Sequence, residues 1–371
     1  MRSSIVMRAS RFLLVALAVG ATVTFVARAD QSQFVNAKVE TRALNRGLAN
    51  TVQQIAADPQ QPVWIAYEVP GLPGNHFDCC AQSHNGSVCG TCDLEEHGKS
   101  MVISGQNNAS SQNNTVELEQ AEQVTVLLRV EEKQVMRIRV YSQNCTLDAG
   151  SLAVFWITGV RPEDSVGLLT SYVVRADRPE ERNNLAEHAI MAIAQHADRS
   201  TDVALANFVE PNRPLWLREK ASFWLGAARG KSGLVVLEKM AANDPDSEIR
   251  AKVAFAMFVS HEPQAIDDII HMAKDDSDAH VRGQALFWLG QKAGQKAAST
   301  ITGAIQNDPD TEVKKKAVFA LTQMPAGEGV PKLIEVAESN KNPEVRKQAM
   351  FWLGQSKDPR ALAFFEKILS Q

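Results

Sequence analysis

Cysteine is scarce in this sequence, and the five that occur lie close together. All of them fall between positions 79 and 145, and the C-terminal half of the chain has none. Cysteines confined to one segment serve one domain, so any disulfide or thiol chemistry belongs there. The candidates for disulfides are Cys79, Cys80, Cys89, Cys92 and Cys145.

The sequence also lacks a block of basic residues. Lys and Arg number 39 against 43 Asp and Glu, a formal net charge of −4. Without a basic footprint a protein releases few counterions from a phosphate backbone, which argues against nucleic acid as a partner. The same absence gives no reason to expect attraction to anionic lipids. No Ser/His/Asp set, phosphate loop or carboxylate pair stands out, so we expect neither enzymatic activity nor a cofactor.

Long apolar runs are absent after residue 26, so no later segment is long enough to span a bilayer. The one apolar run, Phe12 to about Val26, follows three arginines and ends at the small-x-small pattern Ala27-Arg28-Ala29. This pattern predicts a signal peptide over residues 1–29, although an uncleaved anchor stays open. Cleavage would change the net charge to 35 − 43 = −8. We expect a periplasmic or cell-envelope protein with no membrane span after cleavage.

In an exported chain the cysteines are expected to pair as disulfides, with one thiol left over that the sequence does not identify. The alternative is a zinc or redox site in the Cys79–Cys92 segment. Cys89-Gly-Thr-Cys92 has redox-motif spacing, and His76, His84 and His97 lie nearby. The strand-turn-helix setting of a thioredoxin-like motif is missing, however.

Residues 30–174 are predicted to form a β-rich, disulfide-containing domain. A short helix is expected near 43–57, and branched and aromatic residues predict strands at 62–69, 124–130, 135–140 and 151–160. We expect a small sandwich or open barrel. A further helix should begin near Pro162, and the polar stretch 175–184 is predicted to be a linker.

The abundant feature is a repeat of 32 residues. Each clear copy opens on an apolar-basic pair and reaches a small or branched residue four positions later; the pairs are Leu217-Arg218, Ile249-Arg250, Val281-Arg282, Val313-Lys314 and Val345-Arg346. Stepping back 32 positions gives Leu185, a degenerate first copy. A fixed period of this size is typical of stacked helical hairpins, so six units are predicted over residues 185–371.

Each unit is predicted to contain a helix A and a helix B. Helix A begins after an acidic turn such as Asp308-Pro-Asp-Thr-Glu312, whose short side chain caps it. It should end at Gly226, Gly290 or Gly354 in a left-handed conformation. The turn and the Ala285–Gly290 motif resemble the HEAT family, specifically the short bacterial HEAT-like repeats also seen in phycobilisome lyases. The resemblance covers about half the chain and implies an all-α solenoid. The whole layout resembles exported bacterial HEAT repeat proteins.

Phenylalanine occupies the sixth position after the opening residue in all five clear copies: Phe223, Phe255, Phe287, Phe319 and Phe351. These rings either wedge between adjacent A helices or form an apolar ladder on an outer face, which would mark a partner-binding site. The next position alternates between tryptophan (Trp224, Trp288, Trp352) and alanine. We expect these tryptophans in the core.

The recurring basic residues Arg218, Arg250, Arg282, Lys314 and Arg346 are predicted to form a structural ladder between repeats. The resemblance implies that they bridge acidic or carbonyl groups of the preceding turn. His261-Glu262 invites comparison with the di-iron HEAT protein deoxyhypusine hydroxylase, but the matching helix positions elsewhere cannot ligate iron as a set. The sequence therefore favours a multidomain, non-enzymatic exported scaffold whose solenoid binds an unidentified protein, with a thiol or zinc protein as the alternative.

Overall fold

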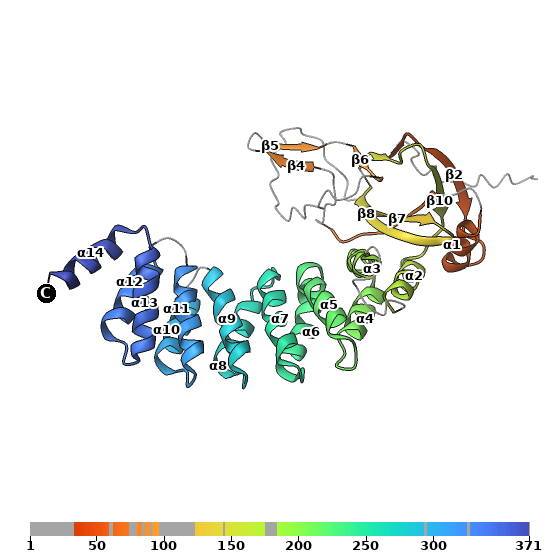
Figure 1. Cartoon of the computed structure of the whole chain (residues 1–371). Coiled ribbons are helices and arrows are strands. Elements are labelled where there is room, and N and C mark those ends of the chain that lie inside the picture. The colour runs from red at the N-terminus through yellow and green to blue at the C-terminus, as the bar shows by residue number, and fades with distance from the viewer. Residues whose placement is uncertain are drawn as a thin grey trace, which may run out of the picture. The chain divides into compact units, whose positions relative to one another are not determined.

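A computed structural model describes residues 33–58, 62–73, 80–83, 86–89, 91–95, 123–143, 145–174, 184–292, 295–324 and 327–370. The predicted signal peptide, nearly all of the predicted linker, Cys79 and the three histidines near it lie outside these residues, as do the side chains of Cys80 and Cys89. The predicted order is confirmed: a sheet-containing region is followed by an all-helical region (Figure 1).

The β region is built on one five-stranded sheet with strand order β2-β10-β3-β7-β8. Its strands are β2 (Lys38–Ala43), β10 (Ala153–Thr158), β3 (Val63–Pro70), β7 (Gln123–Glu131) and β8 (Gln134–Ser142). Both β2 and β3 run parallel to β10, whereas the β3-β7 and β7-β8 pairs are antiparallel. The main sheet is therefore mixed, and the expectation of a sandwich or open barrel was wrong. Helix α1 (Leu48–Ala56) lies between β2 and β3 in the chain and allows the two strands to run the same way.

Smaller strands complete the region. A three-stranded sheet has the order β1-β9-β6, and β4 pairs with β5 in a hairpin. Their bounds are β1 (Phe34–Val35), β4 (Cys80–Ser83), β5 (Gly86–Cys89), β6 (Cys92–Asp93) and β9 (Leu147–Asp148).

One face of the main sheet shares a hydrophobic core with helices. Ile65 and Tyr67 on β3 are fully buried in the same cluster as Leu48 and Ile55 on α1 and Leu169 on helix α2 (Pro162–Val174). Alternate residues of a strand point to opposite faces, so these side chains leave the other face to Trp64, Leu127 and Arg129. There Glu95 accepts hydrogen bonds from Trp64 Nε1 at 2.8 Å and from Arg129. The sheet is thus covered by helices on one face and contacts the segment around Glu95 on the other.

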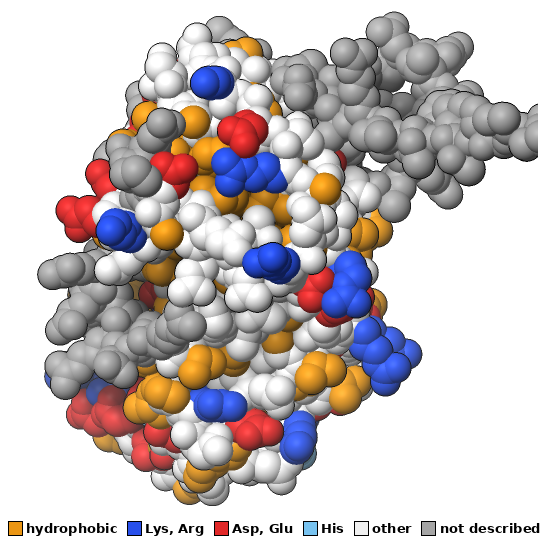
Figure 2. All heavy atoms as spheres, turned by 90° about the vertical axis from the view of Figure 1, so that its right-hand side faces the viewer, with side chains coloured by type: hydrophobic (Ala, Val, Ile, Leu, Met, Phe, Trp, Pro, Cys, Tyr) orange, Lys and Arg blue, Asp and Glu red, His pale blue; other side chains and the backbone are white. Residues whose placement is uncertain are grey.

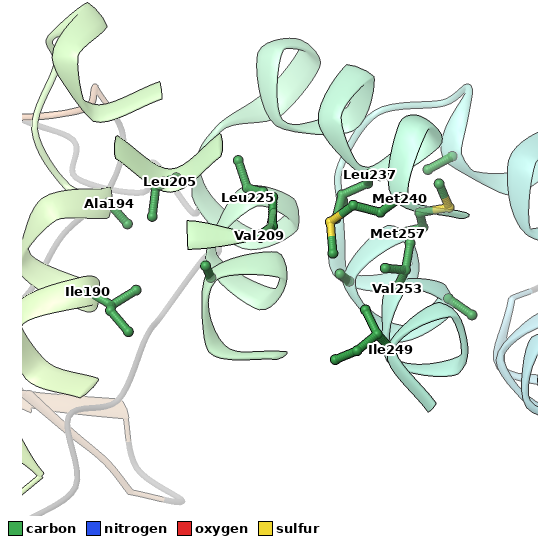
Figure 3. Packing of buried hydrophobic residues seen from close by; sticks show 14 of the residues in the cluster. Ile190, Ala194, Leu205, Val209, Leu225, Leu237, Met240, Ile249, Val253 and Met257 are labelled. Carbon is green, nitrogen blue, oxygen red and sulfur yellow. The ribbon is translucent and has the colours of Figure 1, made fainter. Parts of the chain in front are cut away.

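The described residues of the helical region form six pairs of helices, each a helix A followed by a helix B. The A helices are α3 (Leu185–Ala194), α5 (Leu215–Ala228), α7 (Ser247–Val259), α9 (Ala279–Gln291), α11 (Thr311–Thr322) and α13 (Pro343–Gln355). The B helices are α4 (Arg199–Phe208), α6 (Gly230–Asn243), α8 (Ala265–Asp275), α10 (Gln295–Asn307), α12 (Gly329–Ser339) and α14 (Pro359–Leu369). Figure 3 shows Leu237 and Met240 of α6 pointing toward Ile249, Val253 and Met257 of α7. Stacking therefore buries apolar faces that a lone hairpin would expose.

Short polar side chains cap four of the six A helices as predicted, whereas α3 and α5 begin without a side-chain cap. Asp246 accepts hydrogen bonds from the backbone N–H groups of Glu248 and Ile249, and Asp310 does the same for Glu312 and Val313. Asp278 and Asn342 cap α9 and α13. Each cap satisfies donors that the first helical turn leaves without partners.

The glycines in helix A have a different role from the one predicted. Gly226, Gly290 and Gly354 lie within α5, α9 and α13, and none has a positive φ. A Cβ on Gly226 would overlap the carbonyl of Ala256 in the next A helix, and one on Gly290 would lie 2.5 Å from the carbonyl oxygen of Ala320. Gly226 and Gly290 allow neighbouring A helices to approach closely, and none of the three glycines forms the left-handed helix end that was predicted.

The first repeat is continuous with the β region. Helix α3 packs against β8 and α2 on one side and against α5 on the other. The end of β3 also pairs with the segment after α3: Ala197 donates its N–H to Pro70 O at 2.8 Å, and Leu72 donates to Gln195 O at 3.0 Å. Solenoids need their terminal repeats covered, and here β8 and α2 cover the N-terminal one.

We expect Gly226→Ala to destabilise the protein by about 3 kcal/mol, because the added methyl has to push two backbones apart. Gly354→Ala is the matched control, since nothing lies within 4 Å of its would-be Cβ. That change should stabilise by about 0.5–1 kcal/mol through helix propensity alone. Urea denaturation of the two variants measures both effects, and equal effects would contradict the close approach at Gly226.

Candidate functional site: the aromatic face of the repeats

The predicted phenylalanine row and its tryptophan neighbours form a continuous series of ring contacts across the A helices. We call this set the aromatic ladder; it comprises Phe223, Trp224, Phe255, Phe258, Phe287, Trp288, Phe319, Phe351 and Trp352. Phe223 stacks on Phe255 with ring centroids 5.9 Å apart, and Phe287 stacks on Phe319 at 6.0 Å. These two contacts occur at the junctions where Gly226 and Gly290 bring the helices together.

At the alternate junctions a tryptophan fills the space between A helices. Trp288 lies 4.6 Å from Phe255 and 4.8 Å from Phe258, and Trp352 lies 4.9 Å from Phe319. The ladder therefore has a two-repeat period: a close glycine junction alternates with a junction filled by tryptophan. Phe258 has no equivalent phenylalanine in the other copies, and the 32-residue pattern did not point to it.

The two predicted arrangements of the phenylalanines occur together. Four of the five rings contact an aromatic ring of a neighbouring A helix and are half-buried. Phe351 contacts Trp352 of its own helix and is 54% exposed. Aromatic pairs in this distance range add to stability beyond the area they bury, so packing holds the rings in place. Their outer surface remains available to a partner.

The tryptophans are less buried than predicted. Trp224, Trp288 and Trp352 are half-buried and pack against the hydrophobic core, whereas Ala256 and Ala320 at the equivalent positions are buried. The alternation of large and small residues is real, but the tryptophan rings are not wholly buried, because the next A helix is too close for a second large ring. They lie against the phenylalanines of the ladder instead. They extend the apolar surface between the phenylalanines.

Charged pairs between repeats accompany the ladder. Lys220 pairs with Glu187 at 3.1 Å, and Lys252 pairs with Glu219 at 3.4 Å, in both cases with the preceding A helix. Lys292 lies 4.8 Å from the centre of the Phe258 ring. In the view of Figure 2, toward the β region, basic and acidic side chains are likewise intermixed with apolar ones. A partner of the ladder therefore meets rings accompanied by compensated charge.

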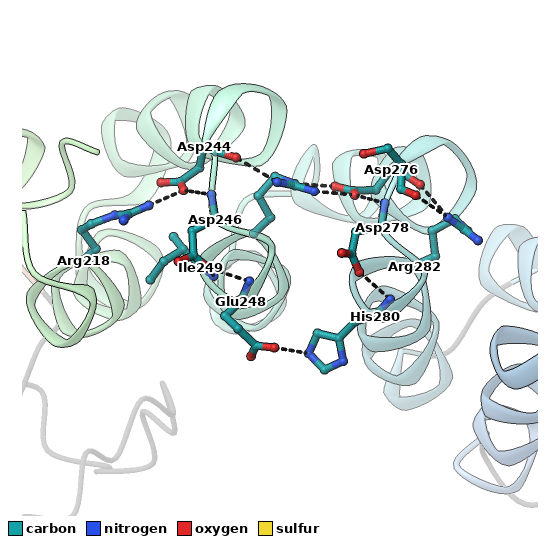
Figure 4. Close-up of polar contacts among 11 residues, drawn as sticks. Arg218, Asp244, Asp246, Glu248, Ile249, Asp276, Asp278, His280 and Arg282 are labelled. Atoms are coloured by element: carbon teal, nitrogen blue, oxygen red, sulfur yellow. Dashed lines mark hydrogen bonds and ion pairs between the residues drawn. The ribbon is translucent and has the colours of Figure 1, made fainter. Parts of the chain in front are cut away.

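The recurring arginines form a second, buried row. Arg250 donates from Nε and Nη2 to the carboxylate of Asp276 at 2.8 and 2.9 Å, and Arg282 binds Asp308 in the same way. Arg218 pairs with Asp244. Figure 4 shows these pairs following one another along the repeats. Two parallel hydrogen bonds from one guanidinium fix both distance and orientation, so the row sets the register of neighbouring repeats.

The carboxylates belong to the following turn, 26 residues further along the chain. The preceding turn contributes backbone carbonyls: Arg250 also donates to Asp244 O at 2.9 Å, and Arg346 donates to Asn340 O at 2.7 Å. The prediction of bridging to the preceding turn was correct for the carbonyls and wrong for the carboxylates. Lys314 bonds only Gln306 O, at 3.2 Å, among the contacts of the described residues. A lysine cannot reproduce the forked geometry of an arginine.

Each aspartate of the arginine row is also held by a hydrogen bond from a backbone N–H of its own turn. Asp276 accepts a hydrogen bond from the backbone N–H of Asp278 at 2.8 Å, and Asp308 does so from Asp310. Burial alone would raise the pKa of Asp276, but the hydrogen bonds from Arg250 and Asp278 outweigh it and keep the pKa below its usual value. The carboxylate therefore stays ionised and paired at neutral pH.

The other predicted site residues do not gather into a centre. His261 is exposed and lies after the end of α7. Cys92 and Cys145 are both buried in the β region, and Cys145 retains a thiol. Among the described residues, no three His, Cys, Asp or Glu side chains are placed to hold a metal ion. No helix among them is long and apolar enough to cross a membrane.

A family model described as HEAT repeats matches residues 234–322 and 299–371. The C-terminal region of the chain is therefore made of HEAT repeats, as the resemblance of the turns predicted. No curated protein matches the sequence.

Several solved structures are similar to this chain, and three of them are described below. Human deoxyhypusine hydroxylase in complex with glycerol is 13% identical, with 56% of this chain and 90% of that chain covered and a TM-score of 0.27. The complex of CpcE and CpcF of phycocyanin lyase from Nostoc sp. PCC7120 is 22% identical over 43% of this chain and 100% of that chain, with a TM-score of 0.33. Kap95p bound to RanGDP is 14% identical over 53% of this chain and 30% of that chain, with a TM-score of 0.35. Similarity this low assigns no activity, and two of the three are enzymes by name.

We expect Arg282→Met to destabilise the protein by about 3–5 kcal/mol, because it leaves the carboxylate of Asp308 buried without its partner. Lys314→Met, at the equivalent position of the next repeat, should cost less than about 0.5 kcal/mol. Thermal unfolding followed by circular dichroism measures the difference. Similar losses in the two variants would show that the buried pair does not hold the repeats in register.

Proposed function

We propose that this protein is an exported, non-enzymatic scaffold that binds another protein through the aromatic ladder. The observation that carries the proposal is the ladder itself, a row of half-exposed rings that continues across five successive repeats. Exposed apolar surface on this scale is characteristic of protein contacts. The rings are already fixed by their neighbours, so a partner would order few side chains on binding.

Two further features support binding over catalysis. The ladder contains no titratable group, and Lys220 and Lys252 beside it are paired with glutamates of the preceding repeat. Aromatic side chains supply much of the binding energy at protein interfaces because they bury large areas with few rotatable bonds. The β region adds a second surface or an envelope anchor. Export rests on the N-terminal sequence pattern.

Replacing Phe223, Phe287 and Phe351 together by Ala should lower the amount of partner captured from a cell-envelope fraction at least tenfold, since hot-spot rings are each worth about 1–2 kcal/mol or more. The full-length chain serves as bait, because α3 packs against the β region. The proteins retained are quantified by mass spectrometry, and direct binding is checked with the purified partner.

Val235→Ser is the matched control for this experiment. Val235 is 58% exposed on α6, away from the ladder, so its loss should leave capture unchanged. Circular dichroism establishes whether the triple variant stays folded. Equal capture by the wild type, the control and a folded triple variant would refute the ladder as the binding site.

The second candidate is an envelope thiol, redox or zinc protein acting through the Cys79–Cys92 segment. The spacing of Cys89 and Cys92 supports it, but Cys92 is disulfide-bonded in the structure, which favours structural bridges. Bridges would stabilise the β region by restricting its unfolded state.

We expect cleavage after Ala29, so that the mature protein begins at Asp30. Intact-mass analysis of the denatured, alkylated protein should find one modified cysteine before reduction and all five after it. Bound zinc under native conditions, or several thiols that react before reduction, would favour the second candidate. An N-terminus that still carries residues 1–29 would show a retained anchor.

A further inference from the structure

A buried polar chain connects the β region to the first repeat. His196, which follows α3, is fully buried, and both of its ring nitrogens have partners. Nδ1 lies 2.7 Å from Ala192 O, and Nε2 lies 2.8 Å from Ser165 Oγ on α2. Ser165 Oγ lies in turn 2.9 Å from the hydroxyl of Tyr67 on β3.

The chemistry of the partners fixes the direction of each hydrogen bond. A backbone carbonyl only accepts, so Nδ1 of His196 carries a proton and donates it to Ala192 O. Nε2 of the neutral ring must then accept from the Ser165 hydroxyl, and Ser165 Oγ accepts from Tyr67. Burial raises the pKa of Tyr67 above its usual range, so the phenol stays a donor. The chain is fully satisfied only while His196 is neutral.

A second proton on His196 has no place in this arrangement. Nε2–H would donate to Ser165, Ser165 would turn its proton toward Tyr67, and the Tyr67 hydroxyl would lose Ser165 as its acceptor. The new charge would also be enclosed without water. Protonation of His196 therefore makes one buried hydrogen bond by breaking another, and a buried polar group that loses its hydrogen bond destabilises the coupled state.

The charges around the ring do not compensate for a proton. Arg229, at the end of α5, donates to His196 O at 2.8 Å and to Ala194 O at 3.1 Å, which places a guanidinium beside the imidazole. Asp198, the cap of α4, is the nearest acid, and Asp202 is already paired with Arg229. Burial, the largest effect, lowers the pKa of His196 from 6.5 to about 4; the hydrogen bond to Ala192 O opposes it, Arg229 adds to it, and Asp198 opposes it more weakly.

The same place carries the backbone contacts between the two regions. The bonds from Ala197 N to Pro70 O and from Leu72 N to Gln195 O flank His196 on either side. Displacing the imidazole therefore disturbs the backbone pairing as well as the side-chain contacts. We propose that His196 is an acid-sensitive latch: protonation of its imidazole uncouples the β region from the first repeat while the remaining repeats stay stacked.

The direction of the pH effect follows from the lowered basicity of the ring. The uncoupled state binds the proton more readily, so the coupled state is fully favoured above about pH 6.5 and loses its advantage as the pH falls toward 4. With ring pKa values of 6.5 when uncoupled and about 4 when coupled, the coupling equilibrium weakens about 30-fold between pH 8 and pH 5.

Amide hydrogen exchange of the full-length protein tests the proposal. Protection of residues 71–73 and 195–198, the two backbone segments at the junction, should fall about 30-fold from pH 8 to pH 5 after correction for the intrinsic pH dependence of exchange. Protection of α7 should stay constant. In His196→Gln, which does not titrate, the ratio of protection between the two segments and α7 should be the same at both pH values.

His271→Gln is the matched control, since the His271 side chain is 78% exposed on α8 and the variant should respond to pH as the wild type does. Should His196→Gln not fold, exchange of the imidazole C2 hydrogen in the wild type reports the pKa of His196 directly. A pKa near 6.5 would overturn the latch. So would an unchanged ratio in the wild type, or a folded His196→Gln that responds to pH as the wild type does.

Discussion

Buried arginine–aspartate pairs cross three successive repeat junctions, and the placement of the ladder rings from Phe223 to Phe319 depends on them. A charge removed from water is tolerated only with a partner in good geometry, so Arg218, Arg250 and Arg282 leave each neighbouring repeat little freedom to slide or rotate. The hydrophobic core between the helices supplies most of the stacking free energy, but apolar contacts are non-directional. The ion pairs select one register among the packings that the core would accept, and that register lines up the rings of the ladder.

Within this register the chain alternates two kinds of junction. A glycine contact brings α5 to α7 and α9 to α11, and a tryptophan separates α7 from α9 and α11 from α13. The repeating unit of the surface is therefore two hairpins, although the repeating unit of the sequence is one. At the close junctions phenylalanine meets phenylalanine, and at the open ones it meets tryptophan, so the apolar row has no gap. A partner bound along this surface would contact a pattern that repeats every two hairpins, which is twice the 32-residue period of the sequence.

Sequence alone predicted the features that depend on local periodicity. The hairpin repeat, the capping aspartates and the recurrence of Phe223 and its equivalents all follow from residues close together in the chain. The features that depend on contacts with neighbouring repeats were not predicted. Gly226 resembles a helix end in sequence, and only the backbone of Ala256 shows why it must be small. Asp276 lies 26 residues from Arg250, so the nearer Asp244 was the natural but wrong choice of carboxylate. The mixed sheet was not predicted because β10, the partner of both β2 and β3, comes about a hundred residues later in the chain.

The junction between the β region and α3 completes the physical account of the chain. A stack of hairpins ends in an apolar face that must be covered, and covering it with a separate region requires polar groups to be buried where the two meet. Tyr67, Ser165 and His196 solve this with a chain in which every donor has one acceptor. Such a chain is strong only in one protonation state, since its three side chains are buried away from bulk solvent. Because the end cover and the first repeat share one titratable group, the proposed latch links the N-terminal end of the scaffold to the acidity of its surroundings. The rings further along carry no titratable group, and the arginine–aspartate pairs lose stability only as the pH falls below the usual carboxyl pKa.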